Sequence, residues 1–295
     1  MSDSHVSAGT PAGRDVEGGV ARAVSVIVPT RNNERTIEAT LASVVAQTEP
    51  NVTLIVVDNA SNDATPEIAQ RYTDVYLEAG PERSAQRNRG IQAAETPWIV
   101  WLDSDMILPP RALEVALDTA EQTGAAGVAL PERTIGTGFW TACRALEREC
   151  YLDQPWLHNP RLLRREFMVG DGEFHLAMSG PEDADLRMKM RRAGHRIELA
   201  PIVIDHDEGH LTLRDVFDKR RYYGRSIPAL EAEHDGAVSD QGRAVLGAYW
   251  SHRGDLARRP LHAAGMVAMR AMEAVGYGYG AWTARREAAS GGQTS

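Results

Sequence analysis

Cysteine is scarce in this chain of 295 residues, which contains only two. Two thiols cannot build the disulfide framework of a small secreted domain, so a reducing compartment is expected. Cys143 and Cys150 lie seven residues apart in a stretch with helical spacing. This position favours buried thiols over a metal site.

Long apolar segments are also missing. No run of about 18 apolar residues occurs, so the sequence predicts no transmembrane helix. The first 22 residues are rich in serine, glycine, alanine and aspartate and lack the apolar core of a signal peptide. We therefore expect residues 1–22 to be a disordered leader, and the protein to be cytoplasmic, at most contacting the inner face of the membrane.

Common nucleic-acid and nucleotide-binding signatures are absent as well. The formal net charge of −9 argues against a nucleic-acid partner. The sequence has neither the Gly-x-Gly-x-x-Gly fingerprint of dinucleotide-binding domains nor the Gly-x4-Gly-Lys-Ser/Thr of a P-loop. A nucleotide would therefore be held by side chains at strand ends. With 43% hydrophobic residues, the chain can bury a sizeable core.

The most informative stretch that is present runs from Trp98 to Pro110. Its apolar start, ending at Leu102, predicts a buried strand, and Asp103 and Asp105 follow directly. Open α/β sheets bind ligands at this end of their strands, and carboxylates spaced Asp-x-Asp suit a hard cation such as Mg²⁺ or Mn²⁺. A turn that caps the next helix is the alternative interpretation of the same residues.

Strand and helix patterns alternate along the first half of the chain, which predicts an α/β fold with a mostly parallel sheet flanked by helices. Residues 136–180 are less regular, and residues 205–210 read as a polar loop. Expected strands are 23–30, 51–57, 74–77, 98–102, 124–130 and one or two within 196–204. Expected helices are 35–47, 65–72, 84–94, 110–122, 139–152, 182–195, 213–233 with an interruption near Gly224 and Pro228, 244–250 and 261–282.

Four segments carry a resemblance, in this order: Val24–Glu34, Leu54–Asp63, Trp101–Asp105 and Gly180–Leu186. Together they resemble the inverting family 2 glycosyltransferases with the GT-A fold, over roughly residues 23–225. The resemblance implies a nucleotide-sugar donor, a divalent metal (Mn²⁺ or Mg²⁺) and inversion at the anomeric carbon. It implies a GT-A (Rossmann-like) domain at 23–235, with a nucleotide-sugar half (23–135), an acceptor half (136–235) and a helical extension (236–295).

The resemblance also assigns the donor side. Asp58 is expected to accept a hydrogen bond from the base, usually uracil, which favours a UDP-sugar. Asp103 would bind ribose or the metal, Asp105 the metal directly. Arg83 and Arg87 would reach the base or diphosphate, unless they form a solvated helix face. The remaining expected donor contacts are Pro29, Thr30 and Asn32 to Glu34 with the nucleoside, and Lys219, Arg220 and Arg221 with the diphosphate.

On the acceptor side, Asp183 matches the family's catalytic base, beside Glu182. A first-turn position lowers a carboxylate's pKa through the helix dipole, and the adjacent Glu182 opposes that effect. An ordinary acidic helix start is the alternative. His206 matches a metal ligand in related proteins, with His210 as second choice. The alternative is a histidine in a solvent-exposed loop that binds no metal.

Two further regions bear on the acceptor and on partners. Aromatic residues between 136 and 180 would stack on a sugar or belong to the core: Trp140, Trp156, Phe174 and the imidazole of His158. Residues 261–282, with arginines on both sides, would lie on a membrane surface, or pack on the catalytic domain or on a second copy in a homodimer. No Gln-x-x-Arg-Trp motif occurs, so transfer of a single sugar is expected rather than polymerisation.

The sequence therefore predicts a metal-dependent inverting glycosyltransferase that moves one sugar to an acceptor hydroxyl in cell-envelope or secondary-metabolite biosynthesis. A nucleotidyltransferase that makes a nucleotide-sugar is one alternative. It would need a glycine-rich loop after the first strand, where this chain has Pro29 to Glu34 without glycine. A non-catalytic GT-A-like binding protein is another, and the presence of every expected carboxylate counts against it.

Overall fold

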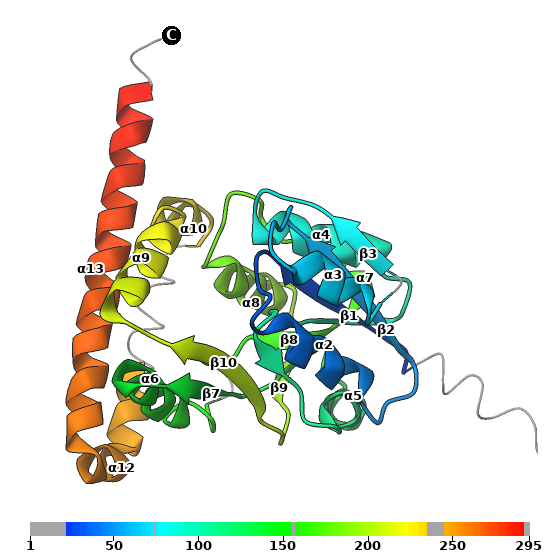
Figure 1. Ribbon diagram of the computed structural model, residues 1–295, viewed down its shortest axis with the longest axis horizontal. Coiled ribbons are helices and arrows are strands. Elements are labelled where there is room, and N and C mark those ends of the chain that lie inside the picture. The colour runs from blue at the N-terminus through cyan, green and yellow to red at the C-terminus, as the bar shows by residue number, and fades with distance from the viewer. Residues whose placement is uncertain (1–21, 74, 155–156, 235–244, 292–295) are drawn as a thin grey trace, which may run out of the picture.

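The computed structural model describes residues 22–73, 75–154, 157–234 and 245–291 (Figure 1). For residues 288–291 it describes the backbone only. Most of the expected leader and Trp156 lie outside the described residues.

The central sheet confirms the predicted α/β architecture. Within the described residues it has seven strands in the order β3-β2-β1-β4-β8-β6-β9. The pairs β1–β2, β1–β4, β2–β3 and β6–β9 are parallel, whereas β8 is antiparallel to β4 and β6. The strands are β1 (Val24–Thr30), β2 (Val52–Asp58), β3 (Val75–Glu78), β4 (Trp98–Trp101), β6 (Gly127–Ala129), β8 (Pro160–Arg164) and β9 (Ile197–Leu199).

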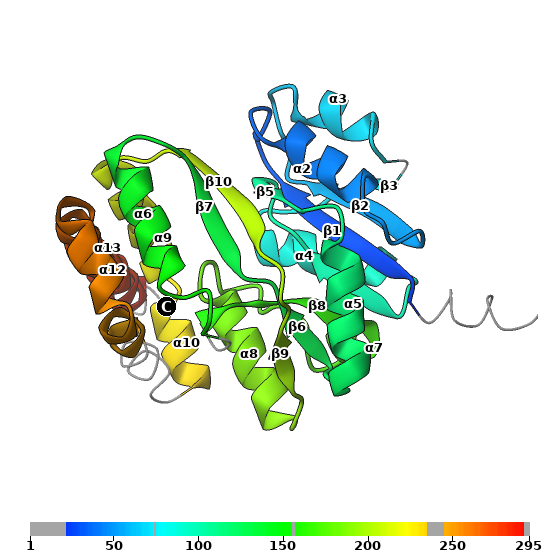
Figure 2. The same cartoon turned by 90° about the horizontal axis from the view of Figure 1, so that it is seen from below.

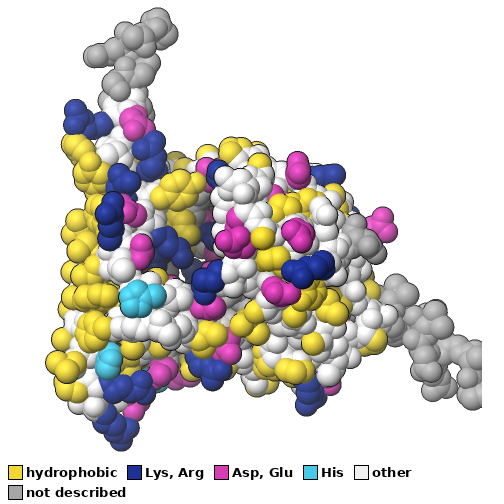
Figure 3. All heavy atoms as spheres, in the orientation of Figure 1, with side chains coloured by type: hydrophobic (Ala, Val, Ile, Leu, Met, Phe, Trp, Pro, Cys, Tyr) yellow, Lys and Arg dark blue, Asp and Glu magenta, His cyan; other side chains and the backbone are white. Residues whose placement is uncertain are grey.

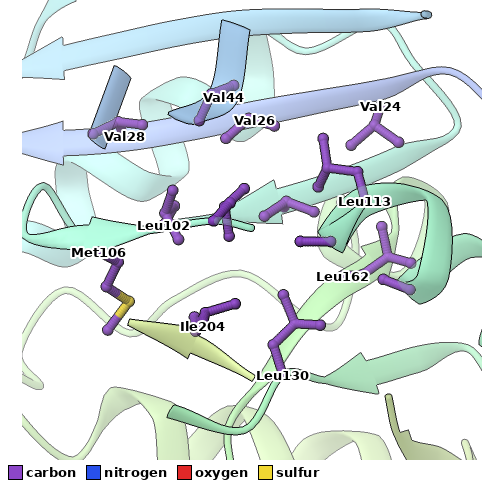
Figure 4. Close-up of a cluster of buried hydrophobic side chains, with 14 of the residues drawn as sticks. Val24, Val26, Val28, Val44, Leu102, Met106, Leu113, Leu130, Leu162 and Ile204 are labelled. Carbon is purple, nitrogen blue, oxygen red and sulfur yellow. The ribbon is translucent and has the colours of Figure 1, made fainter. Parts of the chain in front are cut away.

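Strand β1 is buried along its whole length, and its side chains alternate between two cores. Val24, Val26 and Val28 pack into one cluster, with Val44 and other side chains of the flanking helices (Figure 4). Ile27 packs into the other. The helices that flank the sheet are α2 (Ile37–Val45), α3 (Thr65–Gln70), α4 (Arg83–Ala93), α5 (Ala112–Thr123), α7 (Arg165–Met168) and α8 (Glu182–Arg192).

A second, smaller sheet corrects one prediction. Residues 205–210 are not a loop but most of β10 (Ile204–His210), which pairs with β5 (Met106–Ile107) and β7 (Glu132–Thr137). A loop was predicted because most of these residues are polar, but their side chains alternate as in a strand. Ile204 and His206 are buried, whereas Asp205 and Asp207 pair with arginines at the surface. Ile204 also joins the large core, so this sheet is anchored to the first one (Figure 4).

The C-terminal helices form a separate layer. Helix α13 (Pro260–Gly291) runs along α9 (Leu213–Gly224) and α6 (Phe139–Glu149) at one edge of the molecule (Figures 1 and 2). Glycines permit the close approach of α9 and α13. A Cβ added to Gly280 would lie 2.1 Å from the carbonyl oxygen of Arg221, and one added to Gly224 would lie 2.4 Å from that of Tyr277. Helices α10 (Ile227–Glu233) and α12 (Arg253–Arg258) complete the layer.

The helix interruption predicted near Gly224 and Pro228 is confirmed, because α9 ends at Gly224 and Pro228 occupies the first turn of α10. Helix α13 is longer than the predicted 261–282. Among the described helices, none is both long enough and apolar enough to cross a bilayer.

Candidate active site

A cavity of about 230 Å³ opens between the carboxyl ends of the central strands and the C-terminal helices. Its wall is strongly charged. It includes Asp103 after β4, Arg83 on α4, Asp183 on α8, His206 on β10 and Lys219 on α9. Figure 3 shows this hollow, with basic and acidic side chains gathered around it. The cavity therefore brings together residues that the sequence separates by more than a hundred positions.

Asp103 is held by arginines. Its Oδ1 accepts a hydrogen bond from Arg87 at 3.0 Å, Arg83 lies 3.7 Å from the same oxygen, and Arg161 lies 3.6 Å from Oδ2. Burial alone would raise the pKa of Asp103, but these guanidinium groups outweigh it and hold the pKa well below its usual range. Asp103 is therefore an ionised, fixed carboxylate.

Asp183 shares one of these arginines. Arg87 donates to Asp183 Oδ1 at 2.9 Å, and the amide of Asn159 donates to Oδ2 at 2.8 Å. Burial raises the pKa of Asp183 above its ordinary value, and Glu182 and Asp103 add to this, while Arg87 and Arg83 oppose it. The expected base thus lies in the cavity wall, oriented by two donors and more basic than a free aspartate.

Glu182 has a different position from its neighbour. Its side chain is fully buried, contacts Arg83 and Arg87, and does not reach the cavity wall. The Nε of Arg83 donates to Glu182 Oε1 at 2.9 Å. Glu182 therefore holds the two arginines from behind. The position of Glu182 gives it no direct path to an acceptor.

The residues expected to bind metal divide into two groups. His206 Nε2 lies 3.3 Å from Asp105 Oδ2, and His206 Nδ1 lies 3.1 Å from Glu132 Oε2. Burial and Arg148 would lower the pKa of His206, but Asp105 and Glu132 outweigh them and raise it to about 9. Asp103, by contrast, faces the arginines.

An observation at Asp105 tests whether a cation fits. Its Oδ1 is buried and accepts no hydrogen bond from the described residues, while its Oδ2 contacts His206, which lines the cavity. A buried carboxylate oxygen without a donor suits Mn²⁺ or Mg²⁺, and His206 would give up its proton if its imidazole coordinated the same ion. In the described part of the chain, no three His, Cys, Asp or Glu side chains form a complete metal site by themselves.

The residues expected to contact the nucleoside lie at the adjacent ends of β1 and β2. Thr30 is in register with Asp58, and the Nε2 of Gln86 donates to the carbonyl oxygens of both Thr30 and Val57. Asp58 is buried and accepts hydrogen bonds from the backbone N–H and the hydroxyl of Ser61. Pro29, next to Thr30, pairs in register with Val57.

Asn32 and Glu34 fasten the loop after β1 to the loop after β2. Asn32 Oδ1 accepts from the backbone N–H of Asn62, and Glu34 Oε2 accepts from that of Ala64. Asn32 has a positive φ of 51°, a conformation that asparagine tolerates better than most residues. These two side chains hold the loop after β1 in shape and are not part of the cavity wall.

Lys219 and Arg221 point to different places. Lys219 lines the cavity, whereas Arg221 lies outside it, near Asp218 at 3.7 Å. Between them, Arg220 reaches the cavity and donates to Glu273 of α13 at 2.9 Å. The C-terminal extension therefore supplies part of the cavity wall, which sequence reasoning missed.

The aromatic candidates belong to the core. Trp140 packs with Cys143, Val216 and Met269. Phe174 is buried with its ring edge on Trp101. His158 is also buried and lies 2.7 Å from the carbonyl oxygen of Tyr151, and His210 is absent from the cavity wall.

Sequence reasoning also missed a stack of cations around Trp101. The guanidinium of Arg87 lies 3.9 Å from the ring centroid, and that of Arg161 lies 4.5 Å from it. Arg161 also donates to Glu132 Oε1 at 3.1 Å, and Glu132 lines the cavity. A lone arginine after Pro160 in an irregular stretch gives no sequence signal for this role.

The α/β sheet, with acidic residues at the carboxyl ends of its strands beside a charged cavity, has the GT-A fold of glycosyltransferases. A sequence model described as "Glycosyl transferase family 2" matches residues 25–178, more than half of the chain. The chain belongs to glycosyltransferase family 2.

Particular proteins resemble it over different lengths. The pre-mycofactocin glycosyltransferase of Mycobacterium tuberculosis is 26% identical over 245 residues, covering 75% of this chain and 50% of that protein. The mannosyltransferase PcManGT from Pyrobaculum calidifontis, solved with GDP-Man and Mn²⁺, has a TM-score of 0.54 at 20% identity, over 84% of this chain and 75% of that one. TarS 1–349 of S. aureus, solved with UDP-GlcNAc, has a TM-score of 0.52 at 18% identity, over 90% and 92% of the two chains.

The two solved structures show the fold, not the substrate. The curated relatives are matched over only 30% to 50% of their own lengths.

Proposed function

We propose that this chain is a metal-dependent, inverting glycosyltransferase that moves a single sugar from a UDP-sugar to a hydroxyl group. One observation carries the proposal. The guanidinium of Arg87 binds Asp103 at 3.0 Å and Asp183 at 2.9 Å, so the expected donor carboxylate and the expected base face the same cavity. An inverting transfer needs a base that faces the sugar from the side opposite to the leaving diphosphate, in the cavity that holds the donor.

The donor would lie along the ends of β1, β2 and β4. Asp58 is the acceptor for an N–H of the base, which favours uracil, and TarS, which shares the fold, was solved with UDP-GlcNAc. Pro29 and Thr30 would support the nucleoside in the loop that Asn32 and Glu34 hold in shape. Arg83 and Lys219 line the cavity as cations for the diphosphate.

Asp105 and His206 are the residues that would hold the divalent cation, and PcManGT was solved with Mn²⁺. When bound, such a cation supplies positive charge that stabilises a diphosphate leaving group without a general acid. Asp103, fixed by arginines, is assigned to the ribose rather than to direct coordination.

Asp183 would remove the acceptor proton. As the hydroxyl oxygen attacks the anomeric carbon, its proton passes to a carboxylate oxygen of Asp183 and the bond to the diphosphate breaks on the opposite side. Its raised pKa increases its strength as a base. Arg87 and Asn159 keep the carboxylate oriented toward the cavity, which reduces the entropy cost of reaching the reactive arrangement.

The acceptor is proposed to be a cell-envelope glycan or lipid precursor, or a small secondary metabolite. The side chains that select it are expected among residues 136–180, although His158 and Phe174 are buried and the partly buried Trp140 packs on a core cluster.

The test is a donor panel. UDP-, GDP- and dTDP-sugars are incubated with the full chain, and nucleoside diphosphate release is measured with Mn²⁺, with Mg²⁺ and with EDTA. We expect release from a UDP-sugar that EDTA abolishes and that added metal restores. Preference for another nucleotide would refute the UDP assignment, and full activity in EDTA would refute the metal. The anomeric configuration of the product, read by NMR, tests inversion.

A further inference from the structure

Helix α13 has an outer face without charged residues. Between Leu261 and Trp282, the exposed positions are all uncharged: Leu261, Ala264, Val267, Ala268, Ala271, Ala274, Val275, Gly278, Tyr279 and Trp282. The charged residues of this stretch, Arg270 and Glu273, point inward. At 1.5 Å per residue the face is about 33 Å long. A surface helix normally has the opposite arrangement, with its polar side in water.

The apolar face is wide and contains large side chains at its ends. Leu261 is 75% exposed and Trp282 is 49% exposed, and Trp250, just before α12, is 72% exposed. Figure 3 shows the apolar side chains as a band along the edge of the molecule that α13 forms. Contiguous apolar surfaces of this kind mark protein or membrane contacts.

Arginines lie at both ends of this band. Arg253, Arg258 and Arg259 stand at one end, and Arg285 and Arg286 at the other. All five are exposed, against two exposed carboxylates in α12 and α13, Asp255 and Glu287. Arg253 and Arg286 form no ion pair with any described residue; each instead lies over a tryptophan ring, at 5.2 and 4.8 Å. The other three pair with carboxylates, Arg258 with Asp255, Arg259 with Glu149 and Arg285 with Glu231, so one arginine without an ion pair to a described residue remains at each end.

We propose that the outer face of α13 binds the surface of an anionic lipid bilayer. The apolar side chains would enter the boundary between headgroups and acyl chains, with the arginines binding lipid phosphates at both ends. Tryptophan and tyrosine suit this boundary because they join an apolar ring to a polar atom. The helix would lie on the membrane without crossing it.

Electrostatics favours lipid over a second copy of the chain. The small residues along the middle of the face would accept another helix closely. However, both ends of the band carry arginines, so parallel or antiparallel pairing of two copies would bring arginine groups together. Anionic phosphate groups neutralise both ends at once.

The primary experiment is flotation of the full chain with vesicles. We expect binding to vesicles of equal parts phosphatidylglycerol and phosphatidylcholine, weaker binding at high salt, and little binding to pure phosphatidylcholine. Val275→Glu should weaken binding roughly tenfold or more. Val45→Glu, at 62% exposure on α2 against 60% for Val275, is the matched control and should bind as wild type. Equal effects of the two substitutions, or no vesicle binding, would overturn the proposal.

Two further measurements separate lipid contact from other causes. Brominated lipids should quench the fluorescence of Trp250 and Trp282, and replacing both with Phe should remove that quenching; quenching that persists counts against the proposal. Arg253→Ala with Arg286→Ala should lower binding roughly tenfold. Light scattering gives the oligomeric state: a wild-type dimer that Val275→Glu dissociates, without vesicle binding, would assign the face to a second copy and refute the lipid.

Discussion

Asp103 and Asp105 are separated by one residue, yet arginines surround Asp103 whereas Asp105 contacts a histidine. Asp103 belongs to the arginine-paired side of the cavity, which comprises Asp103, Asp183, Arg83, Arg87 and Arg161. Asp105 lies behind the His206 side of the cavity, which comprises His206 and Lys219: its Oδ2 contacts His206, and its Oδ1 is buried without a hydrogen-bond donor among the described residues.

The difference shows how an Asp-x-Asp sequence can divide two tasks. Fixed arginines on one side stabilise carboxylates in place, so these groups orient and hold. The unsatisfied oxygen on the other side costs stability in the absence of a ligand and is available to one. Such atoms are few in native proteins, and a bound water or ion is one explanation for them.

The largest effect is expected from Asp105→Ala, which removes the available oxygen. Transfer should fall by a factor of about 10³ or more, because the proposed cation loses its carboxylate. The fold should persist, since Asp105 makes no ion pair with a described arginine or lysine. Product formation and Mn²⁺ affinity are the measurements, with Asp118→Ala on α5 as a surface control. Full activity in the Asp105 variant would contradict the assignment of Asp105 to the cation.

Asp183→Asn tests the arginine-paired side. We expect kcat to fall by roughly 10²–10⁴, because an amide cannot accept the acceptor's proton. Donor affinity should change less than about twofold, since Asp183 is assigned to the acceptor. Calorimetric titration with the nucleoside diphosphate separates the two effects. Collapse of donor affinity together with kcat would show that the residue binds the donor instead.

Arg87→Met should cost about 3–5 kcal/mol of unfolding free energy, because it leaves three carboxylates near one another without their shared buried cation. Arg35→Met is the matched control: Arg35 also pairs with an aspartate, at 2.8 Å, but its side chain is 58% exposed. Its loss should cost less than about 1 kcal/mol. Urea denaturation of both variants measures the difference, and equal losses would contradict a structural role for burial.

The pH dependence of kcat follows from Asp183. The base must be ionised to work, and the pKa of Asp183 is raised, so activity should be lost as pH falls through a value above the ordinary 3.8. Below that value kcat should drop tenfold per pH unit. Arg87 and Arg83 oppose the shift, so Arg83→Gln should move the acid limb to still higher pH. A limb that stays in place would remove Arg83 from the set of groups acting on Asp183.

The sequence alone predicted the first half of the fold well. Strand β1 and strand β2 are short β-branched runs, each ending at a polar turn, and such runs have few alternatives in a parallel sheet. The end of the strand before Asp103 and the start of α8 were also predicted correctly, because strand ends and helix starts have local sequence signals.

The rest depended on contacts between distant segments. The sequence of β10 predicts a loop because its outward-facing residues are charged. The strand is stabilised by pairing with β7 and by ion pairs with arginines, which the sequence of β10 does not reveal. Arg161 reaches Asp103 and Trp101 only because β8 enters the sheet antiparallel next to β4. Glu273 enters the cavity wall from a helix more than a hundred residues beyond Asp103. None of these relations has a local signal.

The smallest expected effect distinguishes Lys219 from Arg221, two cations that the sequence treated alike. Lys219 lines the cavity on the His206 side, so Lys219→Ala should raise the KM for the donor by roughly tenfold, the value of one charged contact to a phosphate. Arg221→Ala should leave KM within about twofold, because its guanidinium lies outside the cavity, near Asp218. Donor saturation curves for the two variants give the answer, since equal increases in KM would require α9 to rotate when the donor binds.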